Sequence, residues 1–225
     1  MNEDKIKQEI VDQLIWDDRI VADEVHIDFE NGKIILQGKV GNLLSKRMAE
    51  KKAYRVNGVK EVENKLTVDN RVSDRPKDHN LKESIERGFY WNDYLDYSKL
   101  QVMVDHGLVT LQGTVDAFWK KQLAADIAEN VRGTMEIINQ IVVEKNQNSD
   151  DQQILEALYA NLKSDENTDE SKIEATVVSG YVTLSGKVKN RDQNMQAYET
   201  ALYTRGVTGI DNQLVISNDR QNDFS

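Results

Sequence analysis

The chain contains no cysteine and only one proline and three histidines among its 225 residues. Without cysteine it has no disulfide, no thiolate zinc site and no cysteine nucleophile. No apolar run approaches the roughly 18 residues that a membrane-spanning helix needs. A glycine-rich phosphate loop is also missing, because the glycines are single and spaced as turns. These absences remove the commonest sequence signs of an enzyme and of a transmembrane protein.

Acidic residues outnumber basic ones. The formal net charge is -10, from 29 Lys+Arg and 39 Asp+Glu, and residues 149–225 carry 7 of these basic and 13 of these acidic side chains. The average field therefore repels phosphate backbones and anionic lipid, and we expect no nucleic-acid partner. A hydrophobic content of 39% with 30% charged residues is typical of a globular protein.

The first residues show no targeting signal. Residues 1–5 lead directly into an amphipathic pattern, without the apolar stretch and small-residue cleavage site of a signal peptide. We therefore expect a cytoplasmic protein. Removal of a leader would instead place it in the periplasm.

Three segments of the chain repeat one pattern. Residues 31–40, 106–115 and 179–188 align at offsets of 75 and then 73 residues, and the same offsets relate glycines and asparagines further along. The repeat predicts three units at 1–72, 77–146 and 149–219, with a flexible tail at 220–225. Linkers are expected around Pro76 and at 146–150.

In each unit the spacing of apolar residues changes in the same order along the chain. Apolar residues four apart predict a helix, and two alternating segments then predict a hairpin of half-buried strands. Small residues four apart predict a second helix close to the sheet, and a last alternating segment predicts a third strand. We therefore expect an α+β fold with the order helix, strand, strand, helix, strand. The positions are Ile6/Ile10/Leu14, Leu81/Ile85/Phe89 and Ile154/Leu158/Leu162 for the first helix, and Ala49/Ala53, Ala124/Ala128 and Ala197/Ala201 for the second.

The hairpin turns have glycine in second place, which supplies the positive φ of a tight turn. His106 precedes one of these glycines and is interpreted as a turn residue. None of the histidines falls at an equivalent position in another unit, so we expect no catalytic or metal role for any of them. The turns are Asn31-Gly32, His106-Gly107 and Ser179-Gly180, and the other histidines are His26 and His79.

These residues resemble the BON domain, the module of osmotically inducible OsmY-type proteins and of other bacterial envelope and stress proteins. The resemblance covers nearly the whole chain and rests on three recurring features. They are the strand-bounding Gly38/Gly113/Gly186, the post-helix Gly58/Gly133/Gly206 and the apolar frame around Asn64/Asn139/Asn212.

The resemblance implies two helices packed on one face of a three-stranded mixed sheet. It also implies attachment to phospholipid membranes or other envelope ligands. Two features depart from the family: OsmY-type proteins are exported, whereas this chain shows no leader, and three units are more than many members carry. No catalytic or binding residue is implied by the resemblance.

A candidate binding surface, which we call the apolar-basic corner, begins the second helix of the first and second units. Two apolar side chains precede two cations there, a combination that suits an anionic membrane interface. Arg191-Asp192 replaces the apolar pair in the third unit. Packing inside the protein or between units, with the cations on a solvated helix face, is the alternative. The candidates are Leu43, Leu44, Lys46, Arg47 and Lys51, and Phe118, Trp119, Lys120 and Lys121.

The densest aromatic stretch follows the first helix of the second unit. Trp91 is equivalent to Trp16, and both end that predicted helix, so we expect a structural role for them. Asp93 and Asp96 argue against stacking on nucleic-acid bases. Three tyrosines lie outside the repeated frame and are candidates for a partner surface: Tyr90, Tyr94 and Tyr97.

Taken together, these observations predict a non-enzymatic, stress-associated binding protein. Its first two units would engage an anionic phospholipid surface or a small envelope ligand, and the acidic third unit would be a cap or spacer. The alternative is a soluble scaffold whose tandem modules bind a protein partner or self-associate. No cofactor, metal ion or transmembrane segment is expected.

Overall fold

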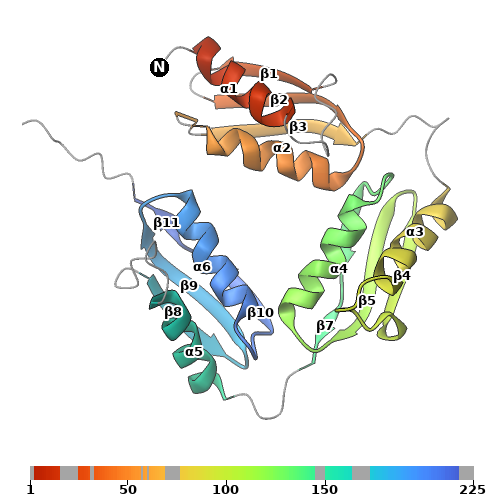
Figure 1. The fold of residues 1–225 in the computed structure, drawn as a ribbon, viewed down its shortest axis with the longest axis vertical. Helices are drawn as coiled ribbons and strands as arrows, with labels where there is room; N and C mark the ends of the chain where they lie inside the picture. The colour runs from red at the N-terminus through yellow and green to blue at the C-terminus, as the bar shows by residue number, and fades with distance from the viewer. Residues whose placement is uncertain are drawn as a thin grey trace, which may run out of the picture. The chain divides into compact units, whose positions relative to one another are not determined.

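The computed structural model describes residues 3–15, 25–30, 33–56, 58–59, 61–68, 77–144, 150–163 and 173–217. These residues form three α+β modules (Figure 1). The first contains α1 (Glu3–Ile15), β1 (Val25–Glu30), β2 (Lys33–Val40), α2 (Leu43–Arg55) and β3 (Glu61–Val68). The second contains α3 (Asp78–Tyr90), the 3-10 helix η2 (Tyr97–Lys99), β4 (Leu100–Asp105), β5 (Leu108–Val115), α4 (Phe118–Asn130), β6 (Glu136–Asn139) and β7 (Val142–Val143). The third contains α5 (Asp151–Lys163), β8 (Ile173–Val178), β9 (Tyr181–Val188), α6 (Arg191–Tyr203), β10 (Gly209–Asn212) and β11 (Val215–Ile216).

The second strand of each module is the centre of a mixed sheet. β1 pairs antiparallel with β2, and β3 pairs parallel with β2 on the other side. In the third module β8 is antiparallel to β9, whereas β10 and β11 are parallel to it. In the second module β5 lies between β4 and the parallel segments β6 and β7. The mixed sheet is therefore confirmed, and the second helix is the crossover that parallel pairing requires.

The apolar residues that the sequence periodicity placed on one face of each helix are buried. Ile6, Ile10 and Leu14 of α1 join a core with Ile34 and Leu36 of β2. Figure 1 shows α1 and α2 on the same side of the first module's sheet. The alanines of the second helices are buried too, which lets these helices approach the strands closely. The α+β prediction is confirmed.

Two hairpin turns have the backbone conformation that the sequence predicts. His106 has φ 50° and Gly107 has φ 80°, and the pair Ser179 and Gly180 has φ 55° and 79°. Two successive positive φ angles are typical of the type I′ turn, whose twist matches that of the flanking strands. The third predicted turn, Asn31-Gly32, lies outside the described residues.

From the sequence we expected the recurring glycines to bound strands, and this expectation is wrong. They lie inside the central strand of each sheet, at Gly38, Gly113 and Gly186. Their φ angles are 121°, 120° and 116°. Within the described residues, the antiparallel ladder between β1 and β2 ends at the pair Val25 and Gly38, whereas the parallel ladder with β3 continues to Val40. The glycine therefore marks the place where the central strand leaves its hairpin partner, at a φ that disfavours side chains.

The third strand is interrupted in the second and third modules, where the alternation predicted one continuous strand. The break follows the recurring asparagine in both. The Asn212 side chain accepts a hydrogen bond from the Leu214 backbone N–H at 3.2 Å, while the Gln213 N–H donates to Leu184 O of β9 at 2.8 Å. The first module has the equivalent bond, from the Leu66 N–H to the Asn64 side chain at 3.2 Å, and its β3 is continuous, so this bond is common to the modules and does not by itself break the strand.

Side chains on the face of each sheet away from the core, which we call the open face, differ between modules. In the first module the Lys33 Nζ lies 3.0 Å from Glu61 and 3.1 Å from Glu63 across the β2–β3 pair. Hydrogen bonding to Glu61 and then Glu63 raises the pKa of Lys33, and the bond from Lys33 lowers the pKa of Glu63. In the second module Gln112 Nε2 instead donates to Gln140 Oε1 at 2.7 Å. The modules thus share a core but not an open face.

The predicted linkers and tail lie outside the described residues, apart from Lys77 and Asp150 at their edges. Among the helices that are described, none is both long and apolar enough to cross a membrane.

Candidate binding surfaces

The apolar-basic corner of the first module is set by a capped helix start. The Asn42 side chain accepts hydrogen bonds from the Ser45 backbone N–H at 2.7 Å and from the Ser45 hydroxyl at 2.8 Å. Asparagine in this role satisfies a backbone donor that the first turn leaves without a partner. Leu43 and Leu44 consequently occupy the first two positions of α2, and both are half-buried.

The cations of this corner follow within two turns. Arg47 is exposed, and Lys46 and Lys51 are half-buried. The spacing of three and four residues places Leu44, Arg47 and Lys51 on one side of α2. The Lys46 backbone carbonyl accepts a hydrogen bond from the Asn64 side chain at 2.9 Å, which ties this turn of the helix to β3. The recurring asparagine is thus a structural residue of the module.

The corner of the second module is built differently. α4 begins at Phe118, and Ala117 stands where the first module has its asparagine cap. The Lys120 ammonium forms an ion pair with Asp116 at 2.8 Å and lies 5.6 Å from the centre of the Trp119 ring. Phe118 is buried, whereas Trp119 is half-buried. Of the two apolar side chains expected at this corner, only Trp119 is therefore accessible to a ligand.

Alignment of the two corners at the helix start changes the sequence interpretation. Both helices have 13 residues, so Leu44 is equivalent to Trp119 and Lys46 to Lys121, whereas Ser45 stands opposite Lys120. Only one of the two predicted cations is therefore common to both corners. Partial burial lowers the pKa of Lys121. A nearby anion would counteract that effect.

The third module lacks the combination. α6 begins with Arg191 and Asp192, both exposed. Asn194 stands at the position of Lys46 and Lys121, and its side chain donates to Leu214 O at 3.0 Å. An uncharged structural residue has replaced the common cation.

The aromatic stretch forms an exposed surface in the second module. Trp91 caps α3, as expected for a residue that ends the helix, and its side chain is 78% exposed, so the structural role lies in the backbone cap rather than in a packed ring. Tyr90 packs edge-on against Trp91, with ring centres 5.2 Å apart, and against Tyr97 at 5.8 Å. Tyr94 is exposed as well. The equivalent Trp16 lies outside the described residues.

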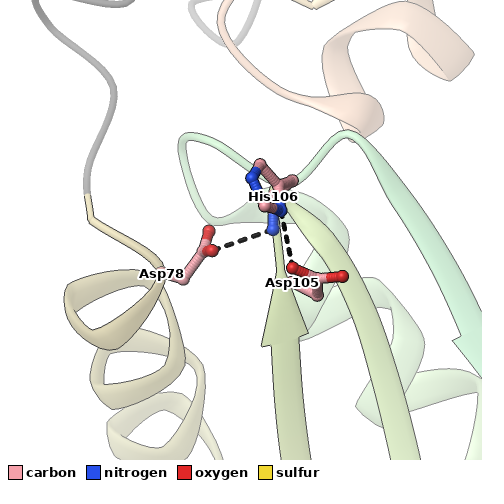
Figure 2. A group of neighbouring side chains, drawn as sticks. All are labelled: Asp78, Asp105 and His106. Atoms are coloured by element: carbon pink, nitrogen blue, oxygen red, sulfur yellow. Dashed lines mark hydrogen bonds and ion pairs between the residues drawn. The ribbon is translucent and has the colours of Figure 1, made fainter.

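A residue that the sequence analysis missed clamps the hairpin turn. The Asp78 carboxylate, in the first turn of α3, accepts a hydrogen bond from the backbone N–H of His106 at 2.8 Å (Figure 2), and it accepts another from the backbone N–H of Gly107 at 3.1 Å. Asp151 of α5 does the same for Ser179 at 2.7 Å and Gly180 at 2.8 Å. The offset of 73 residues between these aspartates was a signal that could have found the clamp.

Asp78, Asp105 and His106 are also the one group in the described part of the chain with the donor atoms of a metal site, within 4.8 Å of one another. The His106 Nδ1 lies 2.6 Å from Asp105 (Figure 2). Both Asp78 oxygens already face backbone N–H donors, whose partial positive charge opposes a cation. In the third module Asp151 makes the same hydrogen bonds to its turn, although Val178 and Ser179 stand in place of Asp105 and His106. The clamp therefore explains this aspartate as a structural residue.

The family comparison agrees with the repeat. The model of the BON domain matches three times, over residues 2–70, 77–145 and 150–218. The chain belongs to the BON family. Membership supports a non-enzymatic role in envelope or lipid association or in interaction with partners. No curated protein matches this BON chain.

Two similar solved structures are of one bacterial protein. Both are of CdsD, the structural protein of the type III secretion system of Chlamydia trachomatis, one of them of its C-terminal domain. Each is 15% identical to the BON chain with a TM-score of 0.26. The C-terminal-domain structure covers 96% of the chain and 100% of its own length, and the other covers 95% and 94%. At this score the likeness carries no argument about function.

The turn clamp yields a stability prediction for the third BON module. Replacing Asp151 by alanine removes two hydrogen bonds to an ionised acceptor, and we expect unfolding of this module to become easier by about 1–2 kcal/mol. Asp151→Asn keeps one acceptor oxygen and should lose about half as much. Urea unfolding followed by segment-resolved hydrogen exchange would measure the change. Glu156→Ala on the same helix removes an exposed carboxylate with no turn to hold, and an equal loss there would contradict the prediction.

Proposed function

We propose that this protein is a stress-associated BON protein that binds anionic phospholipid surfaces through the corners of its first and second modules. The observation that supports the proposal is the recurrence of an apolar residue and a lysine at the same two positions of the second helix. The pairs are Leu44 with Lys46 and Trp119 with Lys121, and the third module has lost both partners. We assign the third module the role of a cap or spacer.

The chemistry of the corner fits the boundary between head groups and acyl chains. An indole ring has an apolar body and one polar N–H, which places tryptophan at such boundaries, and leucine contributes apolar area. A lysine two residues further on reaches a phosphate. Because the whole chain carries a net charge of -10, attraction to an anionic surface must come from these local cations and fall with added salt.

Two corners on one chain strengthen a weak interaction. Once the first corner is bound, the second searches only the volume that the linker allows, so its binding is intramolecular and the combined affinity exceeds either alone. A repeated module with one weak site in each of two copies is suited to this mode of binding.

Sedimentation with vesicles tests the proposal. We expect the native chain to sediment with vesicles that contain phosphatidylglycerol and to remain in solution with pure phosphatidylcholine. Each lysine near an anionic surface contributes about 1 kcal/mol, so Lys46→Gln with Lys121→Gln should weaken binding about thirtyfold. Trp119→Ala should weaken it as well, without a change of charge.

The matched control is Lys187→Gln with Lys189→Gln, which removes two exposed cations from the third module. This variant should bind as the native chain does. The proposal fails if the native chain sediments with neither kind of vesicle, or if the control loses as much binding as the corner variant. Circular dichroism of all variants confirms that each is folded.

A further inference from the structure

Four exposed aromatic side chains lie at the end of α3 and in the segment that follows it, and we call them the aromatic patch. Tyr90, Trp91, Tyr94 and Tyr97 are 63%, 78%, 65% and 46% exposed. A single exposed aromatic residue is ordinary, but four within eight positions, with ring contacts between Tyr90 and two of the others, make an apolar surface of the kind that interaction sites use.

The fold does not require the three tyrosines of the patch. The other two modules form the same two α-helices and the same antiparallel strand pair with other residue types at the equivalent positions of the sequence. Those residues are Ile15, Arg19 and Ala22 in the first module, and Lys163, Asn167 and Glu170 in the third. The tyrosines are thus a property of the second module and call for an explanation other than folding.

The backbone that carries the patch is hydrogen-bonded. The Trp91 N–H donates to Arg87 O at 3.0 Å, and the Leu95 N–H donates to Asn92 O at 3.1 Å. Leu95 is buried and anchors the middle of the loop to the module. Little backbone conformational entropy is therefore lost when a partner covers the rings.

The charges within the patch are negative. Asp93 and Asp96 are the only charged residues between Tyr90 and Ser98, and both are exposed. The Ser98 hydroxyl donates to Asp96 at 2.6 Å and lowers the pKa of that carboxyl, which therefore stays ionised. Arg87 and Lys99 flank the patch, and the Arg87 guanidinium is hydrogen-bonded to the Ser84 hydroxyl at 3.1 Å. Ring faces and carboxylates together attract a cation and disfavour a phosphate.

We propose that the aromatic patch binds a segment of a partner protein that carries arginine side chains. A guanidinium stacks flat on an aromatic face and pairs with a carboxylate at its edge, so rings beside Asp93 and Asp96 supply both halves of the interaction. This ligand has the opposite charge to the phospholipid of the proposed function. The two surfaces can therefore be tested separately on the same chain.

Calorimetric titration with a synthetic octapeptide of alternating glycine and arginine tests the patch, with a glycine–glutamine octapeptide as the neutral probe. We expect the arginine peptide to bind and the neutral one not to bind. Trp91→Ala with Tyr97→Ala leaves the charge unchanged and should weaken binding about tenfold, the effect of two cation–π contacts. Tyr90→Phe with Tyr97→Phe keeps the rings and should retain most of the affinity.

Two control variants separate the patch from general attraction to an acidic protein. Tyr203→Ala removes an exposed ring elsewhere and should not change binding. Asp93→Asn with Asp96→Asn should weaken binding more than Glu136→Gln with Glu144→Gln, which removes two other exposed acids of the second module. The corner variant Lys46→Gln with Lys121→Gln should bind the peptide like the native chain even if it has lost vesicle binding.

Three results would overturn the proposal. The first is the absence of binding by the native chain. The second is equal binding by the aromatic variant and the native chain, which would show that surface charge alone holds the peptide. The third is sedimentation of the native chain with phosphatidylcholine vesicles that depends on Trp91 and Tyr97 while the peptide does not bind, which would make the patch a membrane contact.

Discussion

Replacing Phe89 by alanine is expected to destabilise the second module by about 3–5 kcal/mol, the usual range for removing a buried phenylalanine. The side chain is 1% exposed and lies on the buried face of α3 with Leu81 and Ile85. A module of about 70 residues is expected to have a total free energy of unfolding of about 4–10 kcal/mol. The substitution therefore removes a large part of the stability of this module.

The neighbouring residue is the matched control. Tyr90→Ala removes an aromatic ring of almost the same size from the adjacent position, where the side chain is exposed, and should change stability by no more than about 0.5 kcal/mol. Two of the three tryptophans, Trp91 and Trp119, belong to the second module. Trp91 is already 78% exposed in the folded module, so the measurement is segment-resolved hydrogen exchange of α3 in urea rather than fluorescence. Equal losses for Phe89→Ala and Tyr90→Ala would show that the assignment of the buried face is wrong.

Replacing Gly180 by alanine is expected to destabilise the third module by about 3 kcal/mol. The backbone has φ 79° there, a conformation that L side chains rarely adopt. A Cβ atom would also lie 2.8 Å from the Gly206 carbonyl oxygen and 2.9 Å from Thr208 Cγ2. The Gly206 carbonyl is part of the backbone and moves only with it. The segment that carries it is held beside Gly180 by the hydrogen bond from the Thr208 N–H to Gly180 O at 2.9 Å.

Gly41→Ala supplies the comparison. A Cβ atom at Gly41 meets nothing within 4 Å, and its φ is not in the positive range, so the first module should keep its stability or gain slightly. No tryptophan lies in the third module, so segment-resolved hydrogen exchange in urea is the appropriate measurement. Protection of β9 that is unchanged in Gly180→Ala would contradict the strained-turn argument.

Periodicity and turn chemistry predicted most of the fold. Ile6, Ile10 and Leu14 recur every four residues because one face of the helix is buried, and that burial is visible in the sequence as the absence of polar residues. The glycines after His106 and Ser179 predicted their turns for a similar reason, since few other residues adopt the required φ. Patterns that arise from a local physical requirement could be read directly.

Features that depend on contacts between distant residues could not be read in the same way. Equivalence to Trp16 showed that Trp91 ends a helix, but it gave no information about which side chains cover the ring. The break in the third strand of the second and third modules is another such feature, because an alternating pattern does not record where the pairing with the central strand is interrupted. The burial of Phe118, beside a half-buried Trp119, likewise depends on surroundings that spacing alone does not determine.

Some information was present in the sequence but was not extracted. The offset of 75 residues already made Lys46 equivalent to Lys121 and left Lys120 opposite a serine, so the common cation of the two corners could have been identified without a structure. The burial of Leu95 could also have been predicted in this way, because its counterpart Ile20 in the first module is apolar as well. Comparison of equivalent positions in the three copies was the most informative signal in this chain.

The open faces described above bear on how a chain with three similar cores assembles correctly. If β3 were exchanged onto the sheet of the second module, Glu61 would lie opposite Leu108 and Glu63 opposite Thr110, and both contacts with Lys33 would be lost. Exposed ion pairs contribute little singly, but in tandem repeats domain swapping is a characteristic error of folding. The residues that differ between the sheets therefore favour pairing of each third strand with its own hairpin.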